Sequence, residues 1–361
     1  MRTRALIMCI MAAVLLMSSV TPAGTIYVNP GDSIQAAITS AADGDTIDVA
    51  AGAYDEALSI NKPISLIGAG AGSTSLTCTS GNHEQLIFLG TNSGSSIAGD
   101  LTIQGFSLLA GGGLAGSTPD LIKFRLASTT GTVTISDNAF DGNGQSDIEG
   151  IIESQGAGNF DISGNTFQDL QRALWFNNAH DGTVSGNTMD ACGIGMGGND
   201  AEGNGPRDLV IRGNTIDGAG YGMVLANNIE RIDFSCNTVT NSTGAAVLYW
   251  EYGTYAEWGG VTFNNNNFSG NVEGFMGYND PGVYLPTLVD ATGNWWGDAT
   301  GPSGLGTGGG DSVLLHNLDF SSWLSSPAVC QQQVIPEPVT MVAVGMAVAG
   351  LGGYVRRRRR A

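Results

Sequence analysis

Residues 160–167 read FDISGNTF, and residues 209–216 repeat the same arrangement as LVIRGNTI. Each stretch places an asparagine after alternating apolar and polar residues. Five further stretches align on that asparagine: VTISDNAF, GTVSGNTM, IDFSCNTV, VTFNNNNF and VDATGNWW. Successive asparagines are 22 to 29 residues apart, a period typical of repeat architectures. The seven are Asn138, Asn165, Asn187, Asn214, Asn237, Asn266 and Asn294.

The residues before each asparagine predict a strand with one buried face. The position three residues before it is apolar in every copy, from Ile135 in the first to Ala291 in the last. The position five residues before it is apolar in all copies but one, where Gly182 stands, and mostly polar residues lie between the two. This period of two is typical of a half-buried strand. Because a single strand cannot bury its apolar face, we expect the coils to stack around one continuous core.

Two physical properties explain why asparagine occupies each bend. Asparagine tolerates a left-handed backbone and forms hydrogen bonds within its own turn. In stacked coils the side-chain amides can also form a ladder, in which each amide donates to one neighbour and accepts from the other. We therefore expect the seven asparagines to be structural.

The repeat predicts an all-β fold, a right-handed single-stranded parallel β-helix solenoid. A leucine-rich repeat is the alternative at this period, but the leucine spacing is missing and no helix-length periodic segment lies between the strands. Crossovers between parallel strands are right-handed in about 98% of cases, so we expect a right-handed coil.

Both ends of the repeat region resemble the pectin lyase-like superfamily of right-handed β-helix proteins. The opening stretches are GDSIQAAITSAADGDTIDVAAGAY, INKPISLIGAG and LTIQGF, and the closing stretch is GNWWGDATGPSG. In the first of these, Asp32 or Ser33 is placed to cap a short helix with Ile34 and Ile38 on one face, which would cover the open end of the core. We expect a β-helix domain over residues 24–305, and a C-terminal cap and linker over residues 306–334.

The first 23 residues are typical of a secretory signal peptide. Arg2 and Arg4 precede the apolar stretch ALIMCIMAAVLLM, and small residues follow up to Ala23. A signal anchor is the alternative. The residue pattern favours cleavage and export of the rest of the chain.

The last residues, 335–361, combine three features in a fixed order. The triplet Pro336, Glu337, Pro338 precedes an uncharged stretch over 339–355, which is just long enough for a transmembrane helix. A buried core helix is the alternative, but the arginine cluster that follows, on the side that stays in the cytoplasm, argues against it. The five arginines are Arg356, Arg357, Arg358, Arg359 and Arg360.

Together these features resemble the PEP-CTERM sorting signal of Gram-negative bacteria. The resemblance implies a transient inner-membrane anchor and cleavage near the triplet by an exosortase-type protease. It also implies a final place at the cell surface or outside the cell, in bacteria that make extracellular polysaccharide.

The charge of the exported part argues against a nucleic-acid partner. Without the two ends, seven basic residues remain against 33 acidic ones, or 32 if Glu337 leaves with the tail. Such a surface repels phosphate and uronate backbones unless a cation bridges them. Four cysteines remain after signal removal, and export permits disulfides, but the sequence does not assign their pairing.

The outward positions of the aligned strands offer few catalytic groups. Most carry hydroxyls, and the acid–base candidates are Arg212 with Asp233 one coil later, and Asp161. A surface ion pair is the alternative interpretation of the first two. The three histidines, His83, His180 and His316, are scattered outside the repeat columns, and no catalytic motif of the superfamily is present.

Calcium is the cofactor for which the sequence offers candidate ligands. DGNGQSDIE places oxygen-bearing side chains at alternate positions, as a calcium loop does, but Ser146 stands where such a loop has glycine. A solvated acidic turn is the alternative. The ligand candidates are Asp141, Asn143, Gln145, Asp147 and Glu149.

One long coil is rich in aromatic residues. LYWEYGTYAEWGG contains Trp250, Tyr252, Tyr255 and Trp258, and Tyr278 follows in the next coil. Aromatic side chains on an outward loop can stack on sugar rings; packing over the coils is the alternative. The sequence therefore favours an exported surface or matrix protein that associates with extracellular polysaccharide, and the alternative is a polysaccharide lyase or glycoside hydrolase.

Overall fold

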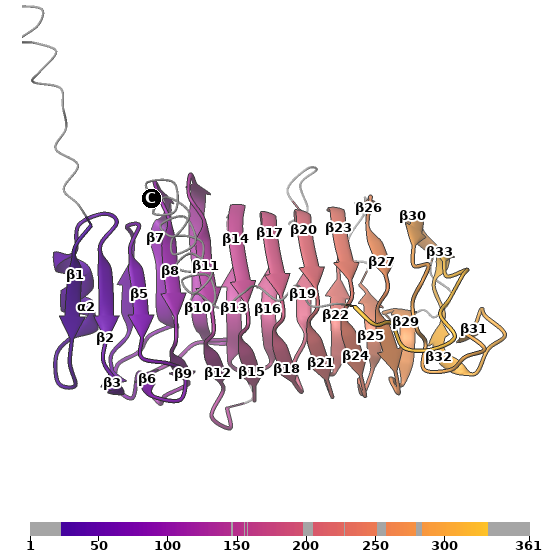
Figure 1. Ribbon diagram of the computed structural model, residues 1–361, viewed down its shortest axis with the longest axis horizontal. Coiled ribbons are helices and arrows are strands. Elements are labelled where there is room, and N and C mark those ends of the chain that lie inside the picture. The colour runs from indigo at the N-terminus through magenta and orange to yellow at the C-terminus, as the bar shows by residue number, and fades with distance from the viewer. Residues whose placement is uncertain are drawn as a thin grey trace, which may run out of the picture. The chain divides into compact units, whose positions relative to one another are not determined.

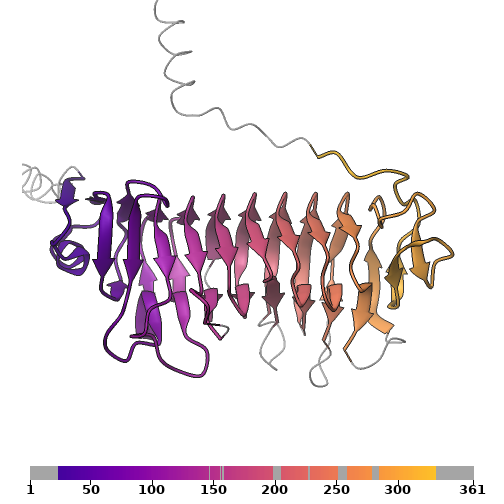
Figure 2. The same cartoon turned by 90° about the horizontal axis from the view of Figure 1, so that it is seen from below.

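The computed structural model describes residues 23–145, 147–154, 156, 158–197, 205–226, 228–250, 258–278 and 284–330. Up to Ala328 the chain forms one compact unit, in which strands wind into successive coils lying side by side (Figures 1 and 2). Every strand pairing in this part of the chain is parallel, as in β1 with β2 or β23 with β27. The fold is a parallel β-helix.

Three parallel sheets form the walls, and each coil contributes one strand to each sheet over most of the length. Sheet A consists of β1 (Thr25–Val28), β2 (Thr46–Val49), β5 (Ser65–Gly68), β8 (Leu101–Gln104), β11 (Val133–Ser136), β14 (Gly158–Ser163), β17 (His180–Ser185), β20 (Arg207–Arg212), β23 (Ile229–Ser235), β26 (Trp258–Gly259), β27 (Thr262–Asn264), β30 (Tyr284–Asp290) and β33 (His316–Asp319). Sheet B consists of β3 (Gly52–Asp55), β6 (Thr74–Thr77), β9 (Ser107–Leu109), β12 (Ala139–Asp141), β15 (Thr166–Gln168), β18 (Thr188–Asp190), β21 (Thr215–Asp217), β24 (Thr238–Thr240) and β28 (Asn267–Ser269). Sheet C consists of β4 (Leu58–Ile60), β7 (Gln85–Ile97), β10 (Asp120–Thr129), β13 (Glu149–Glu153), β16 (Arg172–Phe176), β19 (Ile194–Met196), β22 (Tyr221–Leu225), β25 (Ala245–Tyr249), β29 (Glu273–Gly277), β31 (Pro302–Gly304) and β32 (Gly310–Val313).

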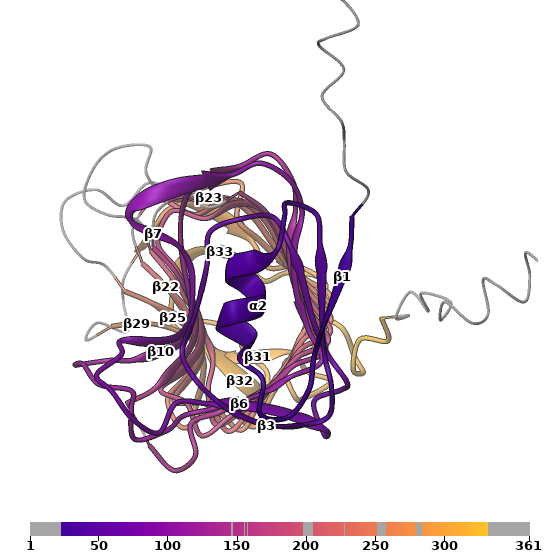
Figure 3. The same ribbon diagram turned by 90° about the vertical axis from the view of Figure 1, so that its left-hand side faces the viewer.

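The coils are right-handed. Figure 3 views the coils from the end that carries β1, and the chain passes from sheet A through sheet B to sheet C clockwise as it recedes from the viewer. The short turn between sheets A and B carries the repeated asparagine, and the longer connections lie before or after sheet C. The expected handedness of the coil is therefore present.

A helix, α2 (Ile34–Ser40), lies within the outline of the coils at the β1 end (Figure 3). Ser33 is its N-cap, and the Ser33 hydroxyl accepts a hydrogen bond from the backbone N–H of Ala36 at 3.1 Å. Ile34, Ala37 and Ile38 form its buried face. The helix thus presents apolar side chains to the first coils.

One continuous cluster of buried apolar side chains runs through the coils from Val28 to Leu318. The positions five and three residues before each asparagine, and two residues after it, point into this core. Side chains at equivalent positions stack from coil to coil, as Phe140 and Phe167 do with ring centroids 4.6 Å apart. This stacking explains why the apolar columns recur at each repeat.

The seven asparagines form a continuous buried ladder, and each is at most 2% exposed. The backbone N–H and the side-chain Nδ2 of Asn165 both donate to Oδ1 of Asn187, at 2.9 and 3.0 Å. The same two bonds join every consecutive pair in the column. Each Nδ2 also donates to a backbone carbonyl of the preceding coil, such as that of Ile135 for Asn165.

Strands continue beyond residue 305, which was the expected end of the β-helix. β32 pairs with β29, and β33 pairs with β30. No helix in the described part of the chain is long and apolar enough to cross a membrane. The expected signal peptide up to residue 22, the Pro336-Glu337-Pro338 triplet, the apolar stretch 339–355 and the arginine cluster lie outside the described residues.

Candidate functional site

The outer face of sheet C carries two exposed aromatic side chains at the ends of neighbouring strands. Trp250 follows β25 and Tyr278 follows β29, and their ring centroids are 5.0 Å apart with an interplanar angle of 31°. The backbone N–H of Tyr278 donates to the carbonyl of Tyr249 at 2.8 Å, so the two strand ends are held in register. Trp250 is 37% exposed and Tyr278 is 45% exposed. The pair offers a flat apolar surface with polar edges to solvent.

A third aromatic side chain, Trp175, lies on the same face three strands before β25, on β16. Its indole lies against Gly195 of the next coil, where an added Cβ would come within 2.1 Å of the ring. The Arg172 guanidinium lies over the indole at 4.6 Å from the ring centroid, and the indole N–H donates to Oδ1 of Asn177 at 3.0 Å. These contacts fix the orientation of the Trp175 ring, which lies between Gly195 and the Arg172 guanidinium.

Small residues cover the face between these aromatic groups. Gly195 and Gly197 lie on one coil and Val224 and Ala226 on the next, in register with the neighbouring strands. With strands about 4.8 Å apart, the three steps from Trp175 to Trp250 span roughly 14 Å along the coils. That length accommodates a few sugar rings lying along the β-helix axis.

A buried pair of carboxyl groups lies at the start of two sheet-C strands. Asp120 of β10 and Glu149 of β13 are partners in the register and are 1% and 6% exposed. Lys123 Nζ lies 3.0 Å from Asp120, and Arg172 Nε lies 3.2 Å from Glu149. Burial raises the pKa of Asp120 to about 7, against the opposing effect of Lys123, and burial also raises the pKa of Glu149. A carboxyl group that titrates near neutrality is a candidate proton donor.

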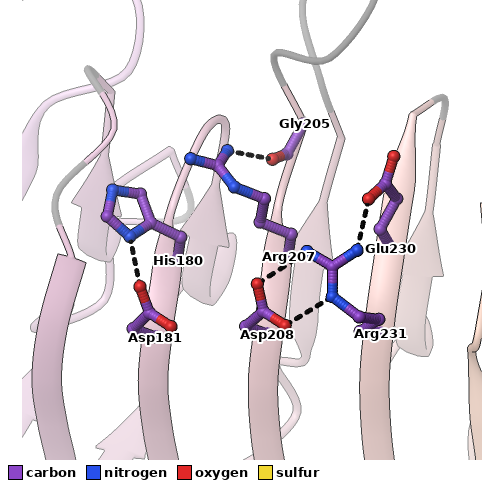
Figure 4. A network of polar contacts seen from close by, with 7 residues as sticks. All are labelled: His180, Asp181, Gly205, Arg207, Asp208, Glu230 and Arg231. Atoms are coloured by element: carbon purple, nitrogen blue, oxygen red, sulfur yellow. Dashed lines mark hydrogen bonds and ion pairs between the residues drawn. The ribbon is translucent and has the colours of Figure 1, made fainter.

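A cluster of charged side chains lies at the corner where the chain passes from sheet C to sheet A (Figure 4). His180, Arg207 and Glu230 are register partners on β17, β20 and β23. The residue after each of them has a left-handed backbone: Asp181, Asp208 and Arg231. This conformation suits aspartate but is uncommon for arginine, and the Arg231 guanidinium binds Asp208 through two hydrogen bonds of 2.5 and 2.7 Å. We call these six residues the corner cluster.

The sequence contains a signal for the corner cluster that lies just outside the aligned stretches. His180, Arg207 and Glu230 each stand seven residues before a ladder asparagine, and their left-handed successors stand six before it. His180 therefore does belong to a repeat column, contrary to the expectation for the histidines. The sheet-C residues have no such signal, because the connections between sheets C and A vary in length.

The expected acid–base pair is not formed. Arg212 is in register with Ser235, whereas Asp233 is in register with Val210, and no ion pair joins Arg212 to Asp233 in the described part of the chain. Asp161 lies between Thr134 and Thr183 of the neighbouring strands, apart from both. The two side chains occupy different columns of sheet A.

The calcium-loop candidates do not form a ligand set. Asp141 accepts hydrogen bonds from the backbone N–H of Asn143 and from the side chain of Gln168, and the Asn143 amide donates to the carbonyl of Ala110. Glu149 is engaged with Arg172, and Asp147 is exposed. Among the residues that the structure describes, no group of three or more His, Cys, Asp or Glu side chains is placed to hold a metal ion.

Of the expected glycan-binding residues, Trp250 is the one whose side chain the structure describes. Tyr252 and Tyr255 lie outside the described residues, and for Trp258 the structure describes the backbone of β26. Tyr278, from the following coil, lies beside Trp250 on the same surface.

Comparison with known proteins bears on the fold. Residues 124–268 match the family model described as "Right handed beta helix region". The sequence matches none of the curated proteins. Similar solved structures include the A-module of the mannuronan C-5 epimerase AlgE4 from Azotobacter vinelandii, with 17% identity over 73% of this chain and 89% of that chain and a TM-score of 0.40.

Two further structures are similar at lower identity. One is an alginate lyase from Paenibacillus sp. str. FPU-7, with 14% identity over 65% of this chain and 97% of that chain and a TM-score of 0.30. The other is a family 28 exopolygalacturonase from Yersinia enterocolitica, with 11% identity over 85% of this chain and 77% of that chain and a TM-score of 0.34. These values are too low for an activity to pass from those proteins to this chain.

Proposed function

We propose that this protein is exported, cleaved by an exosortase-type protease, and held at the cell surface or in the extracellular matrix, where it associates with polysaccharide. The association runs through the outer face of sheet C. The observation that carries the proposal is the exposed pair of Trp250 and Tyr278, which offers ring faces to solvent at the ends of two neighbouring strands.

Ring stacking suits this protein because it does not depend on charge. The exported part is strongly acidic, so long-range attraction cannot recruit a polyanion. Sugar rings present apolar C–H faces, and aromatic side chains bind such faces while polar groups nearby fix the orientation. Trp175 lies on the same face, but its ring is held between Gly195 and the Arg172 guanidinium, so Trp250 and Tyr278 supply the stacking surface.

Two features support the export part of the proposal. The two ends of the sequence match an export signal and a sorting signal. Cys236 and Cys330 are each disulfide-bonded, and disulfides persist chiefly in oxidising compartments outside the cytoplasm.

The test is affinity electrophoresis through gels that contain members of a panel of acidic and neutral polysaccharides. The wild-type protein is expected to be retarded by at least one member. The double variant Trp250→Ala, Tyr278→Ala is expected to lose that retardation, while Tyr27→Ala, which removes an exposed tyrosine on β1, keeps it. Equal retardation of the double variant would overturn the proposed surface.

A second candidate function, cleavage of the polysaccharide, is favoured by the Asp120–Glu149 pair, because the pKa of Asp120 is about 7. Both carboxyl groups are buried, so a polymer reaches them only if neighbouring side chains move, and association therefore remains the leading proposal. If the wild type released new reducing or unsaturated chain ends and Asp120→Asn did not, the protein would be a polysaccharide-cleaving enzyme.

A further inference from the structure

Within the described part of the chain, Arg207 of the corner cluster has fewer partners than the charged residues around it. Arg231 binds Asp208 in a bidentate pair and also donates to Glu230 at 2.6 Å. His180 Nδ1 lies 2.9 Å from Asp181. Arg207, by contrast, donates only to the carbonyl of Gly205, at a long 3.4 Å, and forms no ion pair within the described part of the chain.

The acidic groups around Arg207 are already engaged. The hydrogen bonds from Arg231 lower the pKa of Asp208, and the charges of Arg231, Arg207 and His180 lower it further. Glu230, the register partner of Arg207, is held by Arg231 on the far side. Both acidic neighbours of Arg207 are therefore bound by Arg231, and in the described part of the chain no hydrogen bond joins either of them to the Arg207 guanidinium.

His180 lies beside Arg207. The two are register partners on adjacent strands, and Figure 4 shows the imidazole and the guanidinium extending on the same side of β17 and β20. The His180 ring rests against Gly158 of the preceding coil, where an added Cβ would lie within 2.2 Å of the ring. Its Nδ1 is engaged by Asp181, which directs Nε2 away from the strand.

We propose that Arg207 and His180 form a binding site for a single anionic substituent, a carboxylate or a sulfate half-ester, on the polysaccharide that the protein associates with. Arginine presents a planar fork of donors that matches such an oxyanion. Because Nδ1–H of His180 already donates to Asp181, Nε2 adds a further donor when the ring carries both protons. The proposal deepens the proposed function, on which it rests, by naming the class of glycan as acidic.

The site lies at the edge of the proposed glycan surface. Asn177 and Ala226, on the outer face of sheet C, stand three and four residues before His180 and Glu230. Along the axis, Arg207 precedes Trp250 by two coils, or roughly 10 Å. A polymer stacked on Trp250 and running along the coils can therefore place a substituent of a neighbouring sugar over the corner.

This arrangement explains how a strongly acidic protein can accept a charged glycan selectively. The net negative charge of the protein opposes binding of an anion, and a substituent that meets Arg207 gains a local attraction. The gain is local and depends on ionic strength, because the site is partly exposed and charges in solution are screened over about 8–10 Å.

The experiment is a calorimetric titration with three oligosaccharides of equal length. They are an oligo-uronide, the same oligosaccharide with its carboxyl groups reduced to alcohols, and a sulfated neutral oligosaccharide. The wild type is expected to bind at least one charged form about tenfold or more tightly than the reduced form, the effect of one hydrogen bond to a charged group. Preference for the uronide identifies a carboxylate, and preference for the sulfated sugar identifies a sulfate.

Arg207→Gln is expected to bind charged and reduced forms alike, with the affinity of the wild type for the reduced form. The matched control is Arg212→Gln, which removes an exposed arginine from the other end of the same strand and is expected to keep the preference. Thermal unfolding of both variants checks that the fold is intact.

Two results would overturn this inference: equal affinity of the wild type for charged and reduced forms, or an undiminished preference in Arg207→Gln. Both leave the proposed function standing. Absence of binding to every oligosaccharide and polysaccharide would instead overturn the proposed function itself.

Discussion

Replacement of Asn187 in the centre of the asparagine ladder should destabilise the fold, because buried groups on the two neighbouring coils lose a hydrogen-bond partner as well. Oδ1 of Asn187 accepts from the backbone N–H and from Nδ2 of Asn165. Its Nδ2 donates to the carbonyl of Ile162 and to Oδ1 of Asn214, both at 2.9 Å. Asn187→Ala therefore takes this partner from two buried backbone groups, the N–H of Asn165 and the carbonyl of Ile162. It also removes one of two hydrogen bonds from Nδ2 of Asn165 and one of two from Oδ1 of Asn214.

The magnitude follows from these orphaned groups. Each buried polar group left unpaired costs about 1–3 kcal/mol, and one of the two can recover a bond if a water molecule enters the space. We expect a loss of about 2–4 kcal/mol in the free energy of unfolding. Asn187→Asp keeps the size but replaces the donor by an acceptor that faces the carbonyl of Ile162 and Oδ1 of Asn214, so it should cost at least as much at pH 7.

The assay is urea unfolding followed by circular dichroism, with Asn61→Ala, at an exposed asparagine, as control. The control should unfold within about 0.5 kcal/mol of the wild type, as surface substitutions usually do. A loss below about 1 kcal/mol for Asn187→Ala, or an Asp variant more stable than the Ala variant at pH 7, would refute the donor–acceptor account of the ladder.

Two further predictions concern charge and processing. Burial raises the pKa of Asp120 from 3.8 to about 7, so the folded state keeps a proton that the unfolded state releases, and stability falls as pH rises between these values. At 1.36 kcal/mol per pKa unit the fall is roughly 4 kcal/mol, and Asp120→Asn should remove most of it in urea titrations between pH 4 and 8, whereas an unchanged slope would contradict the burial argument. The protein released from cells should lack residues Val339–Ala361 by intact-mass measurement, and a mass that retains the five arginines would show that the tail is not a processing signal.

The sequence predicts the coil because each structural role returns at a fixed distance from one asparagine. Apolar residues five and three positions before it, and two after it, all point into the core, and the ladder needs an amide at every turn. The cap residue Ser33 and the buried face of α2 follow from the same local rules of helix formation. Short-range chemistry, repeated, is sufficient for this part of the fold.

The candidate site is harder to predict because it combines residues from elements whose spacing varies. Arg212 and Asp233 lie two and four residues before their asparagines, and the strand register pairs them with Ser235 and Val210 and not with each other. Trp175 meets Gly195 only through the pairing of β16 with β19, and the connections that leave sheet C differ in length from coil to coil. Asp120 and Glu149 become a pair only when their strands are in register, so neither is recognisable from its own neighbours in the sequence.

The central claim, that the chain holds polysaccharide through exposed aromatic rings and not through an acid–base site, is tested most directly by equilibrium titration with the retained polysaccharide at pH 6 and pH 8. For an uncharged polysaccharide, which has no anionic group to bind His180, the account predicts that wild-type affinity differs little between the two pH values and that no new chain ends appear. It also predicts that Trp250→Ala with Tyr278→Ala weakens binding by about tenfold to a hundredfold, from the loss of roughly 1.5–3 kcal/mol of apolar contact. Unchanged affinity in the double variant, or cleavage of the polymer with a marked pH optimum, would contradict it.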